Sequence, residues 1–166
     1  MNWMRAFMIL LALSISGPVA AGEYADIAFR AKVASFIDSW HDDAAHARLA
    51  YFDKIAEDGI FIGTDRTERW DRAAFLEWAR PYFARPSAWT FHAINRHVYF
   101  NADKSVIWFD EQLESRLGLC QASGVIRRDR DRFRIAHYQL SLAVPNEIQP
   151  QLSELIAKAA GGAAPK

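Results

Sequence analysis

The sequence predicts a single α+β domain in which helices cover one face of a curved, antiparallel sheet. Apolar residues recur with helical spacing in the first half of the chain, and three apolar-rich segments with tight polar breaks form a meander between residues 105 and 147. The 166 residues, 51% of them apolar, suffice for one sizeable core. Helices that come early and strands that come late are typical of the α+β class.

The N-terminal residues 1–21 have the features of a signal peptide. Arg5 is the only charged residue before Glu23, and an apolar run from Ala6 to Ile15 leads to small residues directly before Gly22. This run is too short to span a bilayer as a helix. We therefore expect cleavage near Gly22 and a periplasmic or secreted protein that makes no membrane contact after cleavage.

Helices are expected at the start of the mature chain. Residues 26–43 carry an apolar stripe at spacings of three and four, formed by Ile27, Val33, Ala34, Ile37 and Trp40. A shorter helix is expected over residues 46–56. Asp71 is a suitable N-cap for a third helix over residues 72–83.

Strands dominate the second half. The first strand is expected over residues 60–65, with a short arm at 68–70 and a long strand over 88–100. The meander adds the segments 105–115, 119–129 and 132–145, and a terminal helix follows over residues 146–159. Without internal repeats or linkers, residues 22–160 form one domain, and residues 161–166 are expected to be a disordered tail.

Charge and cysteine content limit the classes of partner. Twenty basic and twenty acidic side chains balance, so electrostatics do not predict a nucleic-acid partner. The arginines between residues 127 and 134 alternate with Asp129 and Asp131, which indicates a solvated turn. Cys120 is the single cysteine and cannot form an internal disulfide. The five histidines lack metal-ligand spacing, so we expect no metal and no cofactor.

Four segments carry a resemblance to a known superfamily: residues 56–65, 96–100, 108–111 and 134–138. They resemble the cone-shaped fold shared by nuclear transport factor 2, ketosteroid isomerase and the SnoaL polyketide cyclases, with the chain most similar to the SnoaL-like branch of unsettled activity. The resemblance covers roughly residues 26–147 and implies a curved antiparallel sheet wrapped around three N-terminal helices. It identifies residues 22–160 as a SnoaL-like domain. This fold hosts enzymes, binding modules and assembly domains, so it does not define the chemistry.

The catalytic groups of the relatives are replaced here. Isomerase relatives use an aspartate on the first strand as base, and the matching position is Gly63, with Asp65 two residues further on. Cyclase relatives have an aspartate after a histidine–aromatic pair on the last strand, and here His137-Tyr138 precedes Gln139. Both mechanisms of the relatives therefore lose a key group in this chain.

The remaining polar residues within expected strands are the candidates for chemistry: Asp65, Glu68, His97, Asp110, Glu111, His137 and Gln139. Alternation places Asp110 on the same strand face as Trp108, where burial would raise the pKa of a carboxyl group and suit it to acid–base work. His137 would share the face of Phe133 and Ile135 on a neighbouring strand, where it could pair with Asp110. Alternatively, Asp110 is a buried, hydrogen-bonded structural carboxylate and His137 a core histidine.

The sequence supports three functional hypotheses. In the first, the domain binds a small, largely apolar molecule in an internal pocket, with the ligand-binding candidates Glu68, Trp70, Trp89, Trp108 and Gln139. The alternative is an enzyme of isomerase, cyclase or hydratase type that uses Asp110 or Asp65 with His137. The second alternative is an assembly domain. The meander carries apolar residues on both faces and helices can cover only one of them, so a homodimer is expected.

Overall fold

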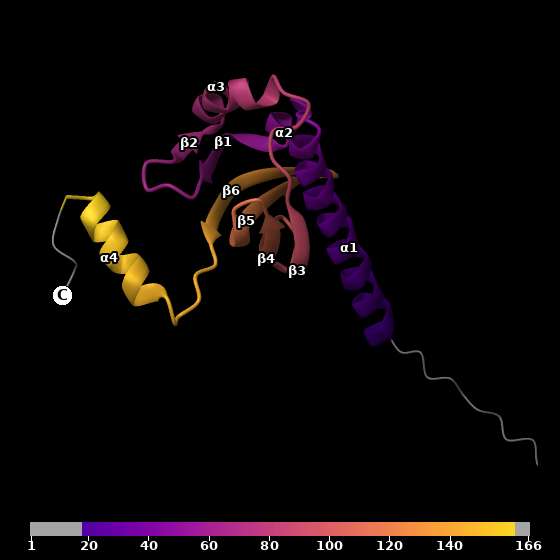
Figure 1. The fold of residues 1–166 in the computed structure, drawn as a ribbon. Helices are drawn as coiled ribbons and strands as arrows, with labels where there is room; N and C mark the ends of the chain where they lie inside the picture. The colour runs from indigo at the N-terminus through magenta and orange to yellow at the C-terminus, as the bar shows by residue number, and fades with distance from the viewer. Residues whose placement is uncertain (1–17, 162–166) are drawn as a thin grey trace, which may run out of the picture.

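The sheet organises the structure, a computed structural model that describes residues 18–161. Its six strands lie in the order β2-β1-β6-β5-β4-β3, and α1, α2 and α3 lie over one side of it (Figure 1). The helices are α1 (Pro18–Ala45), α2 (Ala50–Asp53), α3 (Arg72–Phe83) and α4 (Gln149–Ala159). The strands are β1 (Ile55–Ile62), β2 (Arg69–Asp71), β3 (His92–Phe100), β4 (Val106–Ser115), β5 (Gly118–Asp129) and β6 (Arg132–Leu142). The predicted α+β class with three N-terminal helices is confirmed.

One pairing in the sheet differs from the expected antiparallel pattern. β1 pairs with β6 in parallel, through registers such as Phe61 with Tyr138, while the other strand pairs are antiparallel. The last strand of the meander, β6, therefore lies between β5 and β1. This pairing links the two ends of the domain.

The first helix is longer than predicted and its buried face begins later. α1 starts at Pro18, inside the predicted signal peptide, whose residues 1–17 lie outside the described part of the chain. Ile27 is 55% exposed, whereas Val33, Ile37 and Trp40 are buried. The expected second helix shortens to α2, because Ile55 and Ala56 already belong to β1.

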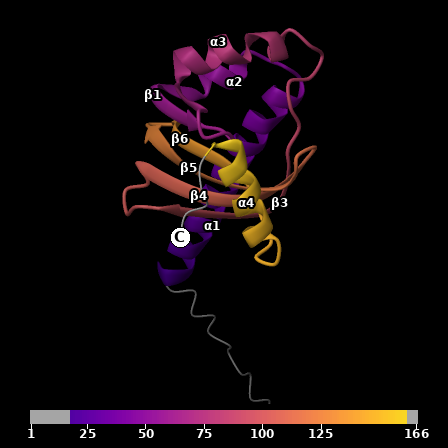
Figure 2. The same ribbon diagram turned by 60° about the vertical axis from the view of Figure 1, so that its left-hand side comes forward.

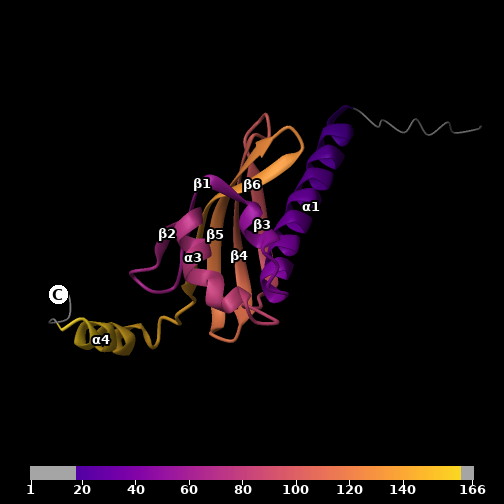
Figure 3. The same cartoon turned by 90° about the horizontal axis from the view of Figure 1, so that it is seen from above.

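A bulge bends the long β5–β6 pair. Val125 faces His137 and Ile126 faces Ile135, so Ala136 is the extra residue on β6. The sheet curves beside α1 (Figures 2 and 3). α4 stands apart from the rest of the domain and contains no buried residue.

The space between α1–α3 and the curved sheet is filled largely by aromatic side chains. Trp40 stacks on Tyr51 at 4.8 Å between ring centroids and meets Tyr138 edge-on, also at 4.8 Å. The helices contribute Val33, Ile37, Trp40, Tyr51, Phe52, Phe75 and Phe83, and the sheet contributes Ile107, Phe109, Leu113, Ile126, Ile135 and Tyr138. We call this covered side of the sheet its inner face, and the opposite side its outer face.

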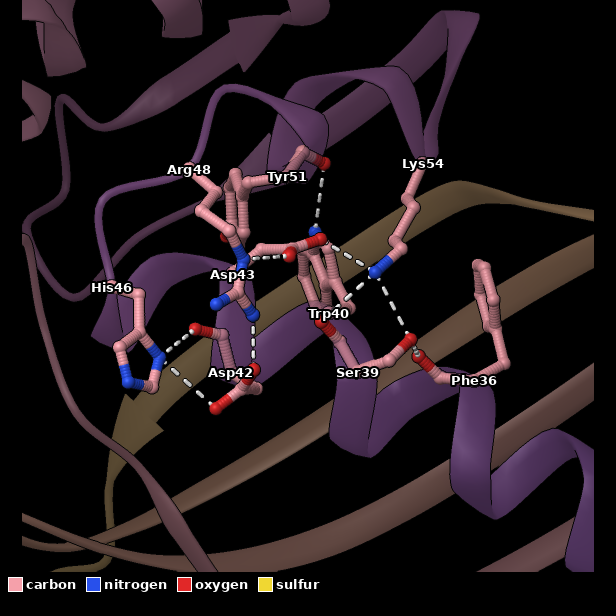
Figure 4. A network of polar contacts seen from close by, with 9 residues as sticks. All are labelled: Phe36, Ser39, Trp40, Asp42, Asp43, His46, Arg48, Tyr51 and Lys54. Atoms are coloured by element: carbon pink, nitrogen blue, oxygen red, sulfur yellow. Dashed lines mark hydrogen bonds and ion pairs between the residues drawn. The ribbon is translucent and has the colours of Figure 1, made fainter.

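A polar network fixes the C-terminal end of α1 (Figure 4). The buried Asp43 accepts hydrogen bonds from Arg48 Nε at 2.7 Å and from Lys54 Nζ at 2.5 Å. Lys54 also donates to the carbonyl oxygen of Ser39 at 2.9 Å, and Trp40 Nε1 donates to the carbonyl oxygen of Tyr51 at 3.1 Å. The last turns of α1 are therefore tied to the segment that leads into β1.

Candidate functional site

A buried ionic cluster lies on the inner face, where α1 crosses β3 and β4. Glu111 on β4 has a fully buried side chain, and its Oε1 lies 2.8 Å from His41 Nε2 on α1. Arg96, its register partner on β3, donates from Nε to Glu111 Oε2 at 2.8 Å. The same guanidinium donates from Nη1 to Asp38 at 2.7 Å and to the carbonyl oxygen of Ala34 at 3.1 Å. One carboxylate thus links α1 to two strands.

The cluster keeps Glu111 ionised. Burial pushes the pKa of the Glu111 carboxyl upward, but the hydrogen bond and positive charge of His41, together with the positive charge and hydrogen bond of Arg96, outweigh it, and its pKa lies below the ordinary value. Tyr138 Oη donates to Glu111 Oε1 at 3.4 Å. Burial and the negative charge of Glu111 raise the pKa of Tyr138 well above its usual value, so this phenol stays a donor.

One nitrogen of the cluster, Arg96 Nη2, has no hydrogen-bond acceptor within residues 18–161. Arg96 Nη2 lies 2.8 Å from Glu111 Oε2, but out of line for a hydrogen bond. Among the described residues it is the one buried side-chain nitrogen or oxygen without a hydrogen-bond partner. The pair is held by charge and by the single bond from Nε.

An aromatic cavity opens between α3, the β1–β2 hairpin and the segment before β3. Its volume is about 220 Å³, and its lining includes Phe61, Trp70, Phe75, Trp78, Tyr82 and Trp89. Trp70 packs on Trp78 at 4.6 Å and on Phe75 at 5.3 Å between ring centroids. Thr64, Glu68 and Arg116 contribute polar groups to the lining of this cavity. An apolar lining with a few polar groups suits a small organic molecule.

A second cavity, which we call the histidine cavity, lies between the C-terminal half of α1 and the start of β3. Its volume is about 310 Å³, and it is lined by Asp38, His41, Asp42, Ala45, Thr90, Phe91, His92 and Ala93. Thr90 and Phe91 line both cavities and so form the wall between them. The amide of Ala88 donates to the carbonyl oxygen of Ala44 at 3.1 Å, which holds this wall against α1.

Three of the predicted ligand-binding residues line the aromatic cavity: Glu68, Trp70 and Trp89. Glu68 fills the space beside Gly63, where a side chain larger than hydrogen would meet its carboxylate. Asp65 lies in the exposed β1–β2 connection instead. Its Oδ1 accepts from the hydroxyl and the amide of Thr67, and these bonds hold the pKa of Asp65 below its usual value. Asp65 thus stabilises a turn.

The structure places Asp110 and Trp108 on the outer face, opposite to the expected side. Trp108 is 45% exposed, and the side chain of Asp110 is 48% exposed and lies 3.0 Å from His97 Nδ1. The side chains of β4 alternate between the two faces as predicted, but the helices cover the face that carries Phe109 and Glu111, not the face of Trp108 and Asp110.

His137 and Gln139 also differ from the expected arrangement. The bulge at Ala136 shifts the alternation on β6, so Ile135 and Tyr138 are buried while His137 is half-buried and Gln139 exposed. β5 lies between β4 and β6, so His137 does not adjoin Asp110. The predicted Asp–His pair is therefore not formed.

The buried pair that does form is Glu111 with His41. Glu111 shares its strand face with Ile107, Phe109 and Leu113, which makes this the more apolar face of β4. A carboxylate on that face is the feature of the sequence that indicates a buried charge. His41 follows Trp40 on α1, and the spacing of the histidines in the sequence does not predict its contact with Glu111. Within residues 18–161, no three His, Cys, Asp or Glu side chains gather closely enough to hold a metal ion.

Helices packed into the hollow of a bent sheet, with the opposite sheet face left uncovered, define the nuclear transport factor 2-like class of α+β domains. Residues 33–145 match the family model of the SnoaL-like domain, and the chain belongs to that family. No curated protein matches the sequence. None of the helices in the described residues is long and apolar enough to cross a membrane.

Solved structures share this fold at low sequence identity. A nuclear transport factor 2-like protein of unknown function from Pseudomonas putida is 11% identical with a TM-score of 0.61, and the match covers 74% of this chain and 92% of that one. A candidate calcium/calmodulin-dependent protein kinase II association domain from Xanthomonas campestris is 16% identical with a TM-score of 0.54, covering 86% and 99%. A candidate ketosteroid isomerase from Parabacteroides distasonis is 17% identical with a TM-score of 0.52, covering 66% and 86%.

Proposed function

We propose that this SnoaL-like domain binds a small, largely apolar, aromatic molecule in the aromatic cavity. The observation that carries the proposal is the lining of three indole rings, Trp70, Trp78 and Trp89, around about 220 Å³. Drug-sized ligands occupy pockets of roughly 300–1,000 Å³, so a molecule of one or two rings is the right size. The carboxylate of Glu68 supplies an acceptor for a polar substituent of the ligand.

Calorimetric titration with indole tests the proposal. Trp78 is 38% exposed and stacks on Trp70, so Trp78→Ala should weaken indole binding while the domain stays folded. Trp108→Ala is the matched control, because Trp108 is 45% exposed but lies on the outer face. Equal indole affinity in both variants and the wild type, or no binding at all, would reject the aromatic cavity as the site.

Export to the periplasm or the medium is the second part of the proposal. It rests on the signal-like residues 1–21 and on the burial pattern of α1. The α1 residues from 21 to 32 are exposed or only partly buried, and the buried face of the helix begins at Val33, so cleavage near Gly22 leaves the core intact. Intact mass of the protein from an export-competent host decides the point, and a soluble product that retains residues 1–21 contradicts it.

Dimerisation through the outer face is the third part. Tyr99, Val106, Trp108 and Leu119 are each 40–45% exposed on this face, and Tyr99 stacks on Trp108 at 6.0 Å. An uncovered apolar sheet face of this kind is typical of an interface with a second copy. Light scattering should give twice the monomer mass for the wild type, and the monomer mass for Trp108→Glu. A wild type that is monomeric at micromolar concentration contradicts dimerisation through the outer face.

A further inference from the structure

The C-terminal helix α4 carries an apolar stripe that nothing in residues 18–161 buries. Its large apolar residues recur at helical spacing, at Ile148, Leu152, Leu155 and Ile156. Leu155 and Ile156 are 61% and 59% exposed, and α4 contains no buried residue. A helix of 11 residues is marginally stable in water unless it packs on a tertiary partner. The stripe therefore needs a surface to pack on.

An exposed apolar surface of this kind lies at the mouth of the aromatic cavity. Trp78 of α3 and Leu117 of the β4–β5 turn line the cavity and are 38% and 52% exposed. Leu142 comes two residues after the cavity-lining Leu140 and pairs with the buried Cys120, so it lies on the inner face, yet it is 49% exposed. We call Trp78, Leu117 and Leu142 the cavity rim.

A short linker holds α4 close to this rim. The amide of Ala143, directly after β6, donates to the carbonyl oxygen of Leu119 at 2.9 Å, which fixes the chain beside Leu142. Residues 144–148 separate this point from α4, and a segment of that length reaches at most about 17 Å. α4 projects from the same end of the sheet as the β1–β2 connection, which also lines the cavity (Figures 1 and 3). The tether therefore gives α4 a high effective concentration at the rim.

The composition of α4 favours the rim over other partners. Helices that lie in a membrane interface have a polar face rich in lysine and arginine, whereas α4 has one acidic and one basic residue, Glu154 and Lys158. The dimer proposed above uses the outer face of the sheet, so it leaves both α4 and the rim uncovered. A helix of 11 residues is about 16 Å long, which is enough to cross the mouth of a cavity of about 220 Å³.

We propose that α4 is a lid of the aromatic cavity, which closes by packing Leu152, Leu155 and Ile156 on the cavity rim of its own chain. The structure shows the open position, and closure requires rotation of the linker 144–148. Burial of the two apolar surfaces favours the closed position in water, with or without a ligand. Docking of α4 rests on these surfaces alone, whereas its effect on a ligand rests on the binding function proposed above: the closed lid separates the ligand from water and slows its release.

The first test needs no ligand. Nuclear Overhauser spectra of the full chain with labelled methyl groups should show contacts of Leu155 with Trp78 and Leu117. Leu155→Gln should remove the contacts of α4 with the rim, and Glu154→Gln, the adjacent position on the polar side of the helix, should keep them. A wild type without these contacts overturns the proposal. Contacts between separately labelled copies in a mixed sample also overturn it, because α4 would then cover the cavity of a second chain.

The second test separates the lid from the ligand-binding function. Stopped-flow release of indole should be up to about tenfold faster in Leu155→Gln than in the wild type, since the packing of one leucine is worth about this factor. Release from Glu154→Gln should be unchanged. Equal release rates in all three proteins reject the lid while indole binding itself stands. Contacts of α4 with the rim in a chain that binds no indole support the docking of α4 and reject the proposed ligand-binding function instead.

Discussion

Replacing Glu111 by glutamine should destabilise the domain far more than replacing its neighbour Asp110 by asparagine. The two carboxylates are adjacent on β4 but lie on opposite faces of the sheet. Without the charge of Glu111, the guanidinium of Arg96, which is 10% exposed, keeps only Asp38 as an ionic partner, and Asp38 is 66% exposed. Breaking one partner of a buried ion pair costs about 3–5 kcal/mol.

The comparison with Asp110→Asn sets the scale. Asp110 and His97 have side chains 48% and 54% exposed, and an exposed ion pair contributes about 0–1 kcal/mol. For a domain of this size, these costs in the free energy of unfolding lower the melting temperature by roughly 10–15 °C in Glu111→Gln. In Asp110→Asn the melting temperature should fall by about 3 °C or less. Calorimetry and urea unfolding measure both. Equal melting temperatures for the two variants would refute the assignment of the inner face.

The same substitution changes the response to acid. The pKa of Glu111 is lowered in the folded state, so its contribution to the free energy of unfolding is complete above the ordinary glutamate pKa of about 4.3 and is lost as the pH falls through the folded value. The gap in stability between wild type and Glu111→Gln should therefore narrow below about pH 4.3. A gap that stays constant down to pH 3 contradicts an ionised Glu111.

Three further substitutions have defined outcomes. Gly124→Ala should cost about 1–3 kcal/mol in urea unfolding, because the new methyl group would overlap the ring of Phe109. Asp71→Ala should cost about 1 kcal/mol by removing the N-cap that accepts from the amide of Ala74 at 2.8 Å, and Asp71→Asn should restore most of it. Asp43→Asn leaves two cations facing a neutral amide, so calorimetry should show a larger loss of stability for it than for Asp71→Ala, and added salt should reduce that loss.

The sequence predicted the elements that local rules govern. Asp71 caps α3 as expected, because an N-cap depends on a side chain and an amide only three residues apart. The residues of the first helix that face the core, such as Val33 and Ile37, follow from its period. The expected helix over residues 46–56 was wrong at both ends: Ala47 has a positive φ in a turn before α2, and pairing of Ile55 with Ile135 on a distant strand favours an extended backbone after it.

The candidate site was harder to predict, because it depends on which strand face is covered. Period-two alternation separates Trp108 and Asp110 from Phe109 and Glu111, and each set holds an aromatic residue and a carboxylate, so only the higher apolar content of the Phe109 face indicates which side is buried. The bulge at Ala136 adds one residue to β6 without any glycine or proline to signal it. The contact of His41 with Glu111 joins residues 70 positions apart, and no local rule reports it.

The parallel pairing of β1 with β6 has a consequence for the order in which the domain can form. β1 is synthesised before the other strands, but its parallel partner is the last strand of the sheet, so β1 has only the short β2 to pair with until β6 has emerged. Contacts of such long sequence separation form slowly, since a long loop must close first. The six-stranded sheet therefore cannot be completed before β6 (Arg132–Leu142) has been synthesised, however early its first strand is available.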